Sequence, residues 1–428
     1  MTVRIVTLGC KVNQVESQSL ARLFAAAGFT VVKDGGADVA VVNSCTVTAE
    51  ADRKTRQTVR RLRRENPGAL VVLTGCLPQA SPEEALRLGE ADLVTGTRER
   101  ERLPALVLAR LAGEGPRGKI ERYRGGERFE TALEADRFDE SFQKAYLKIE
   151  DGCDRSCAYC VIPRSRGRVR SLAPAEIARR AAALAENGYR EIVLTGINLS
   201  RYGADCALTL ADAVEAAAGA CRARLRLGSL EPDLITKEMW DRLAGVEGLC
   251  PQFHLALQSG SDATLSRMRR RYTTAQYLEA VGAARARFDD AQITTDLIAG
   301  FPGETEDDFA ETCEFVREIG LLRAHVFVFS PRPHTLAARL PNPVPRNVAA
   351  ARAKELSAIC TAGGERIARA HIGRTVEVLC EATGTGFAAN GLEVRLPPGT
   401  PKGQLYACRI TKTDGALAEA ASAAPVNA

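Results

Sequence analysis

The segment Cys153-Asp-Arg-Ser-Cys157-Ala-Tyr-Cys160 places three cysteines within eight residues, and Val-Ile-Pro163 and a series of arginines follow it. Thiolates are soft ligands that select zinc, copper(I) or iron–sulfur clusters. Four thiolates fill the iron sites of a [4Fe–4S] cluster, whereas three leave one iron open to a small molecule. Structural zinc sites are the alternative, but they usually have four ligands in spaced pairs or include histidine, and no histidine lies nearby. The spacing therefore favours an iron–sulfur cluster with one open iron.

The composition is that of a globular protein with about three domains, since the chain has 428 residues. No apolar run reaches the length of about 18 residues that a membrane span needs, so no membrane partner is expected. The first residues are too soon interrupted to form a signal peptide. The 13 cysteines are odd in number and scattered, which fits a reducing compartment, and we expect the protein to be cytoplasmic.

A second set of three cysteines follows three predicted strands. The strands are residues 3–8 before Cys10, 38–43 before Cys45, and 69–74 before Cys76. Because helical segments alternate with these strands, the pattern predicts a doubly wound parallel sheet covered on both faces. Ligands sit at the carboxyl edge of such sheets, so we expect the three cysteines to converge there and hold a second cluster. Three unrelated buried thiols are the alternative, since cysteine is common in protein cores.

The rest of this α/β chain divides by pattern. The N-terminal domain is assigned to residues 1–113, and residues 114–138 lose periodicity and predict a linker. Residues 139–370 contain six strand-plus-helix repeats, which predict a partial (β/α)6 barrel with its functional residues at the carboxyl ends of the strands. Residues 371–428 change to short alternating strands, typical of a small all-β barrel of a kind that often binds nucleic acid. The alanine-rich tail after Gly415 is expected to be disordered.

Several motifs, spread in order over almost the whole chain, resemble those of the methylthiotransferases in the radical S-adenosylmethionine (SAM) superfamily. They are Thr7-Leu-Gly-Cys10-Lys-Val-Asn13-Gln-Val-Glu16-Ser17, Val42-Asn-Ser-Cys45-Thr-Val-Thr48, Leu73-Thr-Gly-Cys76, Lys148-Ile-Glu-Asp-Gly-Cys153, Leu257-Gln-Ser-Gly-Ser-Asp262, Arg267-Met-Arg-Arg-Arg-Tyr-Thr-Thr274 and Thr295-Asp-Leu-Ile-Ala-Gly-Phe-Pro-Gly-Glu304. The closing barrel is similar to a TRAM domain. The residues after Cys10 and Cys45, and the basic group 267–271, look most like the branch that acts on N6-threonylcarbamoyladenosine in tRNA. Three stretches depart from the usual family pattern: Leu77-Pro78, residues 329–335 and Asn390-Gly391.

The resemblance implies two [4Fe–4S] clusters and SAM. The cluster on Cys153, Cys157 and Cys160 would produce the radical that abstracts hydrogen from C2 of the purine. The cluster on Cys10, Cys45 and Cys76 would carry the sulfur. In the cofactor site, Tyr159 is expected near the adenine and Gly196 near the methionyl end, Glu231 would reach the ribose or form a structural ion pair, and Ile298 would pack on the adenine or in the core.

A tRNA substrate needs cations that contact its phosphates. The expected contacts with the anticodon stem-loop are Arg53, Lys54, Arg60 and Arg61 in a basic helix, and Arg164, Arg166, Arg168 and Arg170 after the cluster motif. A run of charge is also typical of a solvated face. No residue beyond the cluster ligands is assigned to catalysis.

The leading hypothesis is an enzyme that adds a methylthio group to C2 of N6-threonylcarbamoyladenosine at position 37 of the anticodon loop. One alternative keeps the chemistry but changes the substrate to isopentenyladenosine in tRNA or to an aspartate of a ribosomal protein. Another is a non-catalytic RNA-binding protein with zinc staples. The sequence identifies neither the electron donor nor the sulfur donor.

Overall fold

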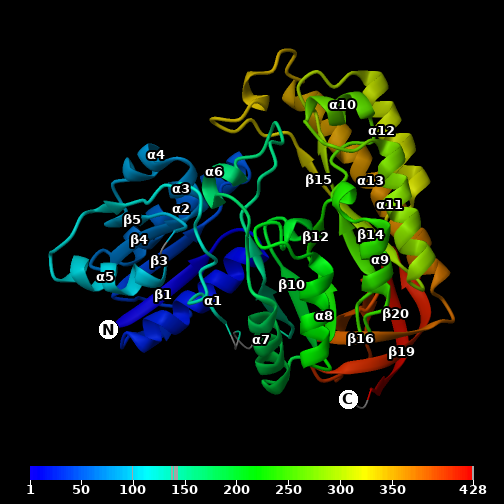
Figure 1. Ribbon diagram of the computed structural model, residues 1–428, viewed down its shortest axis with the longest axis horizontal. Coiled ribbons are helices and arrows are strands. Elements are labelled where there is room, and N and C mark those ends of the chain that lie inside the picture. Colours follow the sequence, from blue (N-terminus) through cyan, green and yellow to red (C-terminus); the bar gives the residue numbers. More distant parts are fainter. Residues whose placement is uncertain (99, 136–137, 139–142, 427–428) are drawn as a thin grey trace. The chain divides into compact units, whose positions relative to one another are not determined.

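The computed structural model describes residues 1–98, 100–135, 138 and 143–426, and the chain forms two compact units (Figure 1). Unit 1 comprises Met1–Asp139, Glu150–Leu172 and Ser330–Thr335, and unit 2 comprises Glu140–Ile149, Ala173–Phe329 and Leu336–Ala428. This division differs from the predicted domains, because the segment with Cys153, Cys157 and Cys160 belongs to unit 1. The predicted boundary near residue 139 lies largely outside the described residues.

Unit 1 contains the predicted doubly wound sheet, with six parallel strands in the order β2-β1-β3-β4-β5-β6. The strands are β1 (Thr2–Thr7), β2 (Thr30–Val32), β3 (Val39–Ser44), β4 (Leu70–Gly75), β5 (Leu93–Thr95) and β6 (Gly118–Lys119). The helices are α1 (Lys11–Ala26), α2 (Ala49–Glu65), α3 (Cys76–Ala80), α4 (Pro82–Leu86), α5 (Leu103–Leu111) and α6 (Ile162–Arg166), with a short 3-10 turn at Arg100–Arg102. A two-stranded antiparallel ribbon joins β8 (Glu150–Asp151) to β9 (Arg170–Ser171).

Two apolar layers hold this sheet. Leu20 and Phe24 of α1 and Val107 of α5 pack on one face, while Val59 and Leu62 of α2 pack on the other. All six residues of β3 are buried, as expected for a central strand of a parallel sheet with both faces covered. The predicted strands and helices of this region are therefore confirmed.

The predicted linker is ordered where the structure describes it. Gly118–Lys119 adds an edge strand to the sheet. The Tyr123 ring then lies against Gly167, where an added Cβ would approach it to 2.5 Å, and the Tyr123 hydroxyl is 2.9 Å from Thr97 Oγ1. This segment therefore packs on unit 1, although its low periodicity predicted a free connection.

Unit 2 contains the predicted partial (β/α)6 barrel. Its strands are β7 (Ala145–Lys148), β10 (Glu191–Thr195), β11 (Arg224–Leu227), β12 (Ser229–Leu230), β13 (Gln252–Leu255), β14 (Gln292–Ala299) and β15 (Arg323–Val328). They form parallel sheets ordered β11-β10-β7 and β12-β13-β14-β15, and only Gly228 separates β11 from β12. The strand positions therefore follow chain order around the barrel.

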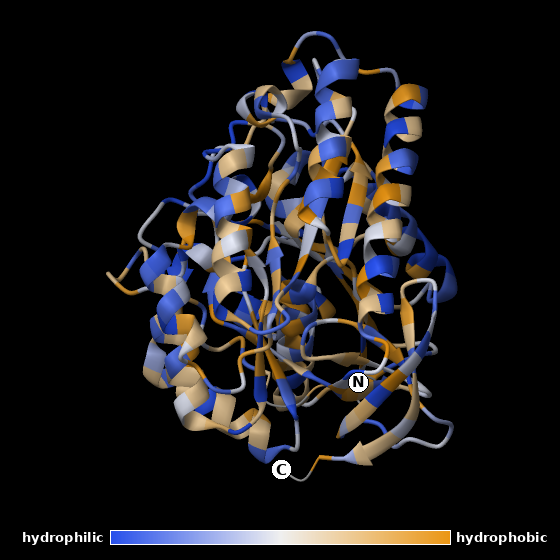
Figure 2. Cartoon of the chain, turned by 90° about the vertical axis from the view of Figure 1, so that its right-hand side faces the viewer, coloured by the Kyte–Doolittle hydropathy of each residue, from blue (hydrophilic) through white to orange (hydrophobic). Residues whose placement is uncertain are grey.

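Helices cover the outside of this barrel, and Figure 2 shows that they carry both hydrophobic and hydrophilic residues. They are α7 (Pro174–Glu186), α8 (Leu210–Ala220), α9 (Lys237–Ala244), α10 (Asp262–Arg267), α11 (Thr274–Arg287), α12 (Glu306–Ile319) and α13 (Arg346–Ala370), with 3-10 turns at Leu199–Arg201, Pro232–Leu234 and Ala337–Arg339. In the described part of the chain, no helix combines the length and the apolar character needed to cross a bilayer.

The C-terminal residues close a five-stranded barrel, as predicted. Its strands are β16 (Thr375–Ala382), β17 (Thr385–Ala388), β18 (Glu393–Arg395), β19 (Leu405–Asp414) and β20 (Leu417–Pro425). The expectation of a disordered tail after Gly415 is wrong, because β20 pairs with both β18 and β19. Ala418 of β20 is fully buried and belongs to the core of the small barrel.

Buried polar groups join this small barrel to the rest of unit 2. Arg224 and Arg226 both donate to the buried Glu191 carboxylate, at 2.6 and 2.8 Å, and Arg226 also donates to the Ala388 carbonyl at 3.1 Å. His371, at the end of α13, lies 2.7 Å from Asp290, and Asn390 donates to the same carboxylate at 2.6 Å. Asn390, one of the departures from the family pattern, therefore has a structural role.

The His371–Asp290 contact predicts a pH-dependent stability. The hydrogen bond that His371 donates to Asp290 raises the pKa of His371. Its contribution to stability is therefore complete below about pH 6.5, the unfolded value, and is lost as the pH rises through the raised folded-state pKa. We expect His371→Gln to lower the free energy of unfolding by about 2 kcal/mol at low pH, and by less at high pH. Denaturant titration of both proteins at about pH 6 and pH 8 measures this difference. If His371→Gln lowered the free energy of unfolding equally at both pH values, the result would contradict a charged contact between His371 and Asp290.

Candidate functional site

The first three cysteines converge at the carboxyl edge of the unit 1 sheet. Cys10 follows β1 and precedes α1, Cys45 follows β3, and Cys76 is the first residue of α3 directly after β4. Because β1, β3 and β4 are neighbours in register, their ends meet at one place. The predicted convergence of Cys10, Cys45 and Cys76 is therefore found.

Buried amide and hydroxyl groups fix the three strand ends. Asn13 Nδ2 donates to the Ser44 carbonyl at 3.1 Å, and Asn43 Nδ2 donates to the Asn13 carbonyl at 3.1 Å. Ser44 Oγ donates to the Thr74 carbonyl at 2.7 Å and accepts from the Leu77 N–H at 3.2 Å. The Cys10 thiol itself donates to Asn13 Oδ1 at 3.3 Å. Each cysteine thus lies within three residues of a group that is hydrogen-bonded to a neighbouring loop. These groups are Asn13 for Cys10, Ser44 for Cys45 and Leu77 for Cys76.

Glycines allow the loops to approach closely. Gly9 has φ +119°, and a Cβ there would lie 2.8 Å from the Cys45 Cβ. Gly75 has φ +103°, and a Cβ there would lie 2.6 Å from Ser44 backbone atoms. These positions require glycine both for the backbone angle and for the space.

Burial and neighbouring charges shift the pKa values of Cys10 and Cys45. Burial raises the pKa of Cys45 to about 12, and the neighbouring Cys76 adds to this rise. Cys10 keeps an exposed edge, yet the protein around its thiol raises its pKa, and the Arg166 guanidinium opposes that rise. A positively charged ligand or metal centre would convert these thiols to thiolates.

The second three cysteines lie in the loop between β8 and β9. Gly152, at φ +91°, lets the chain turn against the Arg168 carbonyl, and the Cys153 N–H donates to the Gly167 carbonyl at 3.0 Å. Backbone N–H groups also donate to sulfur, from Arg155 to Cys153 Sγ and from Ile162 to Cys160 Sγ, each at 3.4 Å. Such donors stabilise thiolates, which are the form that binds iron.

A buried ion-pair network joins the two cysteine sets within unit 1. We call it the Glu16 network: Glu16, Arg100, Asp151, Arg166 and Arg170. Glu16, on α1, pairs with both Arg100 and Arg166, and all three side chains are only 1% exposed. Arg166 also donates to Asn13 Oδ1 at 3.3 Å, the atom that accepts from Cys10. Asp151, next to the second cysteine loop, lies 3.6 Å from Arg166 and 3.3 Å from Arg170.

The network brings positive charge close to the first thiols, because Arg166 donates to the Asn13 oxygen that accepts from the Cys10 thiol. Although burial opposes it, the neighbouring Cys76 and Glu16 raise the pKa of Arg166 well above its usual range. An iron–sulfur cluster held by three thiolates is anionic, so this charge fits the group that the sequence predicts.

The prediction of RNA contacts is wrong for Arg166 and Arg170, because both side chains are buried in this network. The side chains of the four arginines alternate along the segment, and Arg164 and Arg168 are exposed. In the basic helix, Arg53 pairs with Glu50 at 2.6 Å and Arg60 with Glu90 at 3.2 Å. Lys54 and Arg61 remain exposed.

The six cysteines of the two sets are the candidate metal ligands of unit 1. All six cysteines are free thiols. Among the described residues, no three or more histidine, cysteine, aspartate or glutamate side chains surround one point closely enough to bind a single metal ion. Zinc staples need four donors at about 2.0–2.3 Å from one ion, whereas a [4Fe–4S] cluster spans several atoms and separates its ligands. The assignment of Cys10, Cys45, Cys76, Cys153, Cys157 and Cys160 as cluster ligands stays a prediction.

The predicted cofactor residues lie in both units. Tyr159 is half-buried in the second cysteine loop of unit 1, and Gly196 directly follows β10 in unit 2. Glu231 follows β12 and pairs with Arg270. This ion pair is one of the two roles that the sequence left open for Glu231. The contact of Glu231 with a ribose stays a prediction. Ile298 is not core, because it alternates with the buried Leu297 and Ala299 on β14 and is partly exposed.

Sequence reasoning missed several residues of the site. Asn13, Glu16, Asn43 and Ser44 were quoted in motifs but given no role, although a run of polar residues at the end of a fully buried strand is itself a signal. Arg332 lies in a stretch that departs from the family pattern. It is buried, pairs with Asp52, and donates to Thr46 Oγ1 at 2.8 Å, so it supports the loop that follows Cys45.

Comparison with known proteins gives a consistent result. Residues 147–316 match the radical SAM superfamily, and residues 2–96 match a family described as "Uncharacterized protein family UPF0004". A relative from Thermotoga maritima, named threonylcarbamoyladenosine tRNA methylthiotransferase MtaB, is 39% identical over 81% of this chain and 79% of its own. The Bacillus subtilis protein of the same name is 35% identical over 89% and 85% of the two chains.

Other relatives carry a different name. A tRNA-2-methylthio-N(6)-dimethylallyladenosine synthase from Acidothermus cellulolyticus is 37% identical over 88% of this chain and 77% of its own. Among solved structures, the radical SAM methyltransferase TsrM from Kitasatospora setae superposes with a TM-score of 0.59 at 15% identity, covering 78% of this chain and 73% of its own. That likeness concerns the fold.

The Glu16 network predicts a large loss of stability on removal of its central charge. Glu16→Gln removes the carboxylate that pairs with Arg100 and leaves Arg166 only its longer contact with Asp151, which costs about 3–5 kcal/mol in the free energy of unfolding. Denaturant titration of the full chain, followed by circular dichroism, measures this loss. The matched control is Glu50→Gln, which breaks an exposed pair with Arg53 and should leave the transition unchanged. Equal transitions for both variants would show that the network does not stabilise unit 1.

The glycine before Cys10 predicts a specific loss of metal. Gly9→Ala forces a Cβ against Cys45 and strains φ, so we expect the variant to lose the iron and sulfide of the first site and keep those of the second. The control Gly28→Ala has a similar positive φ but open space around its Cβ. Iron and sulfide analysis after anaerobic purification compares them. Equal metal content in both variants would mean that the close approach to Cys45 does not matter.

Proposed function

We propose that this chain, which belongs to the tRNA methylthiotransferases of the radical SAM superfamily, adds a methylthio group to C2 of N6-threonylcarbamoyladenosine in tRNA. The modified nucleotide is position 37 of the anticodon loop, and the enzyme works in the cytoplasm. The observation that carries the proposal is the presence of two three-cysteine sets in one compact unit, joined through Cys10, Asn13, Arg166 and Asp151.

The protein uses two [4Fe–4S] clusters and SAM, which when bound supply one-electron cleavage of a carbon–sulfur bond and a sulfur atom for transfer. In our proposal Cys153, Cys157 and Cys160 hold the cluster that binds SAM, and Cys10, Cys45 and Cys76 hold the other. With three ligands each, both sets leave one iron open. The polypeptide fixes these positions.

The side chains around the cysteines have separate tasks. Arg166 supplies positive charge beside the first set and holds the second loop through Asp151. Tyr159 is half-exposed between two cysteine ligands and can pack against the adenine of SAM. Arg164 and Arg168 point outward from the same segment, so they are the cations available for RNA phosphates next to the second set.

The choice of substrate branch rests on the first cysteine loop and on the relatives. The residues Cys10-Lys-Val-Asn13 resemble the threonylcarbamoyladenosine branch, and relatives with that name cover most of the chain. The second candidate is the dimethylallyladenosine branch, because relatives of similar identity carry that name.

The test is mass spectrometry of tRNA nucleosides from a strain that lacks the gene, complemented by the parent or by single-cysteine variants. We expect the parent to restore 2-methylthio-N6-threonylcarbamoyladenosine. Cys157→Ala should abolish both the product and the formation of 5′-deoxyadenosine, since it removes a ligand of the radical cluster. Cys45→Ala should abolish the product but keep 5′-deoxyadenosine formation. Cys206→Ala, which changes an exposed cysteine of unit 2, is the matched control and should behave as the parent.

The other outcomes assign other functions. Restoration of a methylthiolated dimethylallyladenosine would favour the sister branch. Unchanged 2-methylthio nucleosides in the deletion strain would eliminate the tRNA reaction. A Cys45→Ala variant that still methylthiolates tRNA would disprove the sulfur-carrying role of the first set.

A further inference from the structure

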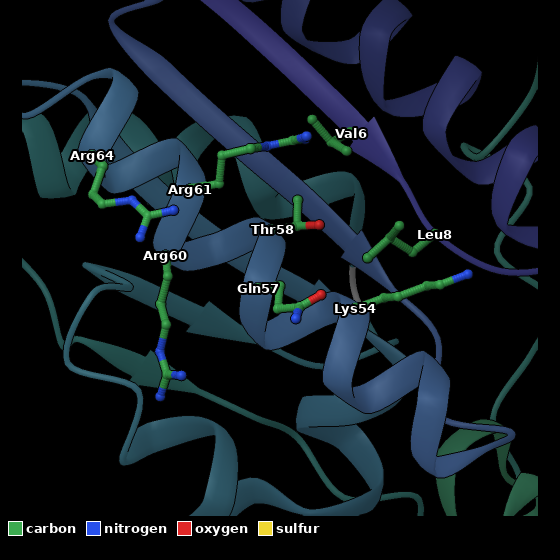
Figure 3. A pocket seen from close by; sticks show the side chains of 8 residues that line it. All are labelled: Val6, Leu8, Lys54, Gln57, Thr58, Arg60, Arg61 and Arg64. Atoms are coloured by element: carbon green, nitrogen blue, oxygen red, sulfur yellow. The ribbon is translucent and has the colours of Figure 1, made fainter.

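Unit 1 has a groove beside α2 that the catalytic proposal does not use. It has a volume of about 630 Å³, and we call it the α2 groove, defined by its lining residues Val6, Leu8, Lys54, Gln57, Thr58, Arg60, Arg61 and Arg64 (Figure 3). The lining contains four cations and no carboxylate. Val6 and Leu8 form an apolar floor and are partly buried against the cluster that contains Val59 and Leu62 of α2.

The cations of the groove form a stripe along one side of the helix. Lys54, Gln57, Arg61 and Arg64 recur at intervals of three and four residues, which places them on one face. The opposite positions, Thr55, Val59 and Leu62, are buried. Figure 3 shows Lys54 extending toward Leu8 and Arg61 extending toward Val6, while Arg60 points away from both.

The stripe is also the part of α2 whose charge is least neutralised. Arg53, Arg56 and Arg60 pair with Glu50, Glu84 and Glu90 at 2.6, 2.6 and 3.2 Å. Arg61 approaches Glu65 only to 3.7 Å and is half-exposed. Within the described residues, Lys54 and Arg64 form no ion pair. The free positive charge of the helix is thus concentrated over the groove.

The spacing of these cations suits a polymer better than a small anion. Arg61 is seven positions after Lys54, and Arg64 is ten positions after Lys54. These offsets correspond to about 10 Å and about 15 Å along the helix axis. A single phosphate ligand needs cations that converge on one point, whereas one nucleic-acid strand presents a phosphate about every 3.4 Å of axis. A straight stripe of about 15 Å therefore matches several successive phosphates, and the apolar floor can take ribose.

The groove begins next to the first cysteine set. Leu8 is two residues before Cys10, and Lys54 is in the second turn of α2, whose first turn follows the Cys45 loop. Arg64 is at the opposite end of the helix. We propose that the α2 groove binds the sugar–phosphate backbone of tRNA that flanks the modified nucleotide, with Lys54 nearest the cysteines. This inference rests on the proposed function and adds a path for the substrate strand.

The experiment measures the affinity of the intact, cluster-loaded enzyme for unmodified tRNA at a series of KCl concentrations. The groove variant is Lys54→Gln/Arg61→Gln/Arg64→Gln. Each lost phosphate contact lowers the salt slope by about one, so we expect a slope shallower by two to three and a higher KM for tRNA. The control variant, Arg56→Gln/Arg87→Gln/Arg179→Gln, removes the same charge outside the groove and should keep the parental slope.

Further readouts separate the possible outcomes. Iron content and 5′-deoxyadenosine formation should be unchanged in the groove variant, which shows that it is folded and loaded. Equal salt slopes for the two variants would overturn the groove proposal and leave the methylthiotransferase function standing. An unchanged tRNA slope with slower reduction by an acidic electron-transfer protein would assign the groove to that protein instead. If the parent fails to methylthiolate tRNA but binds it with a groove-dependent slope, the proposed function fails and the groove stands.

Discussion

The buried carboxylate of Glu16 is the constraint on which the arrangement of unit 1 depends. An ionised carboxylate with 1% exposure is costly to desolvate, and the cost is offset only where its partners are close and well oriented. Those partners are Arg100 and Arg166, which come from two other segments of the chain. The ion pairs therefore fix the relative position of α1, the turn before α5 and the loop after Cys160. Hydrophobic packing alone would tolerate small shifts between these segments, whereas a buried charge would not.

This network also explains how two cysteine sets separated by about 80 residues in sequence come to share one unit. The first set is positioned by the sheet, because parallel neighbours end at a common edge and because Asn13, Asn43 and Ser44 hydrogen-bond one strand end to the next. The second set is positioned by a two-stranded ribbon and by Arg166. Asn13 belongs to both arrangements, since it accepts from the Cys10 thiol and from Arg166. The position of each set thus depends on the same buried amide.

Much of this fold could be predicted from sequence, and the failures have a physical pattern. Alternation and glycine or cysteine boundaries located the strands of unit 1 and the partial barrel, since those signals are local. The four arginines after Cys160 were all expected to meet RNA, but charge density says nothing about partners far away in sequence. Glu16 precedes Arg166 by 150 residues, so only the folded chain shows that the arginine is neutralised. Likewise, β20 has few large apolar residues, and its order comes from pairing with β18 and β19.

The alternation of the arginines after the second cysteine set has a functional consequence. Arg166 and Arg170 point inward and stabilise the cysteine loops, whereas Arg164 and Arg168 point outward. One short segment therefore holds the cluster site together and presents cations to solvent, so a substrate that contacts the outward arginines is placed relative to the cysteines by the inward ones. On α2 the same division occurs across a helix, where Arg53, Arg56 and Arg60 are occupied by protein carboxylates and Lys54, Arg61 and Arg64 face the groove. In both places the acidic residues of the protein determine which cations remain available to RNA, and the number of basic residues in the sequence does not.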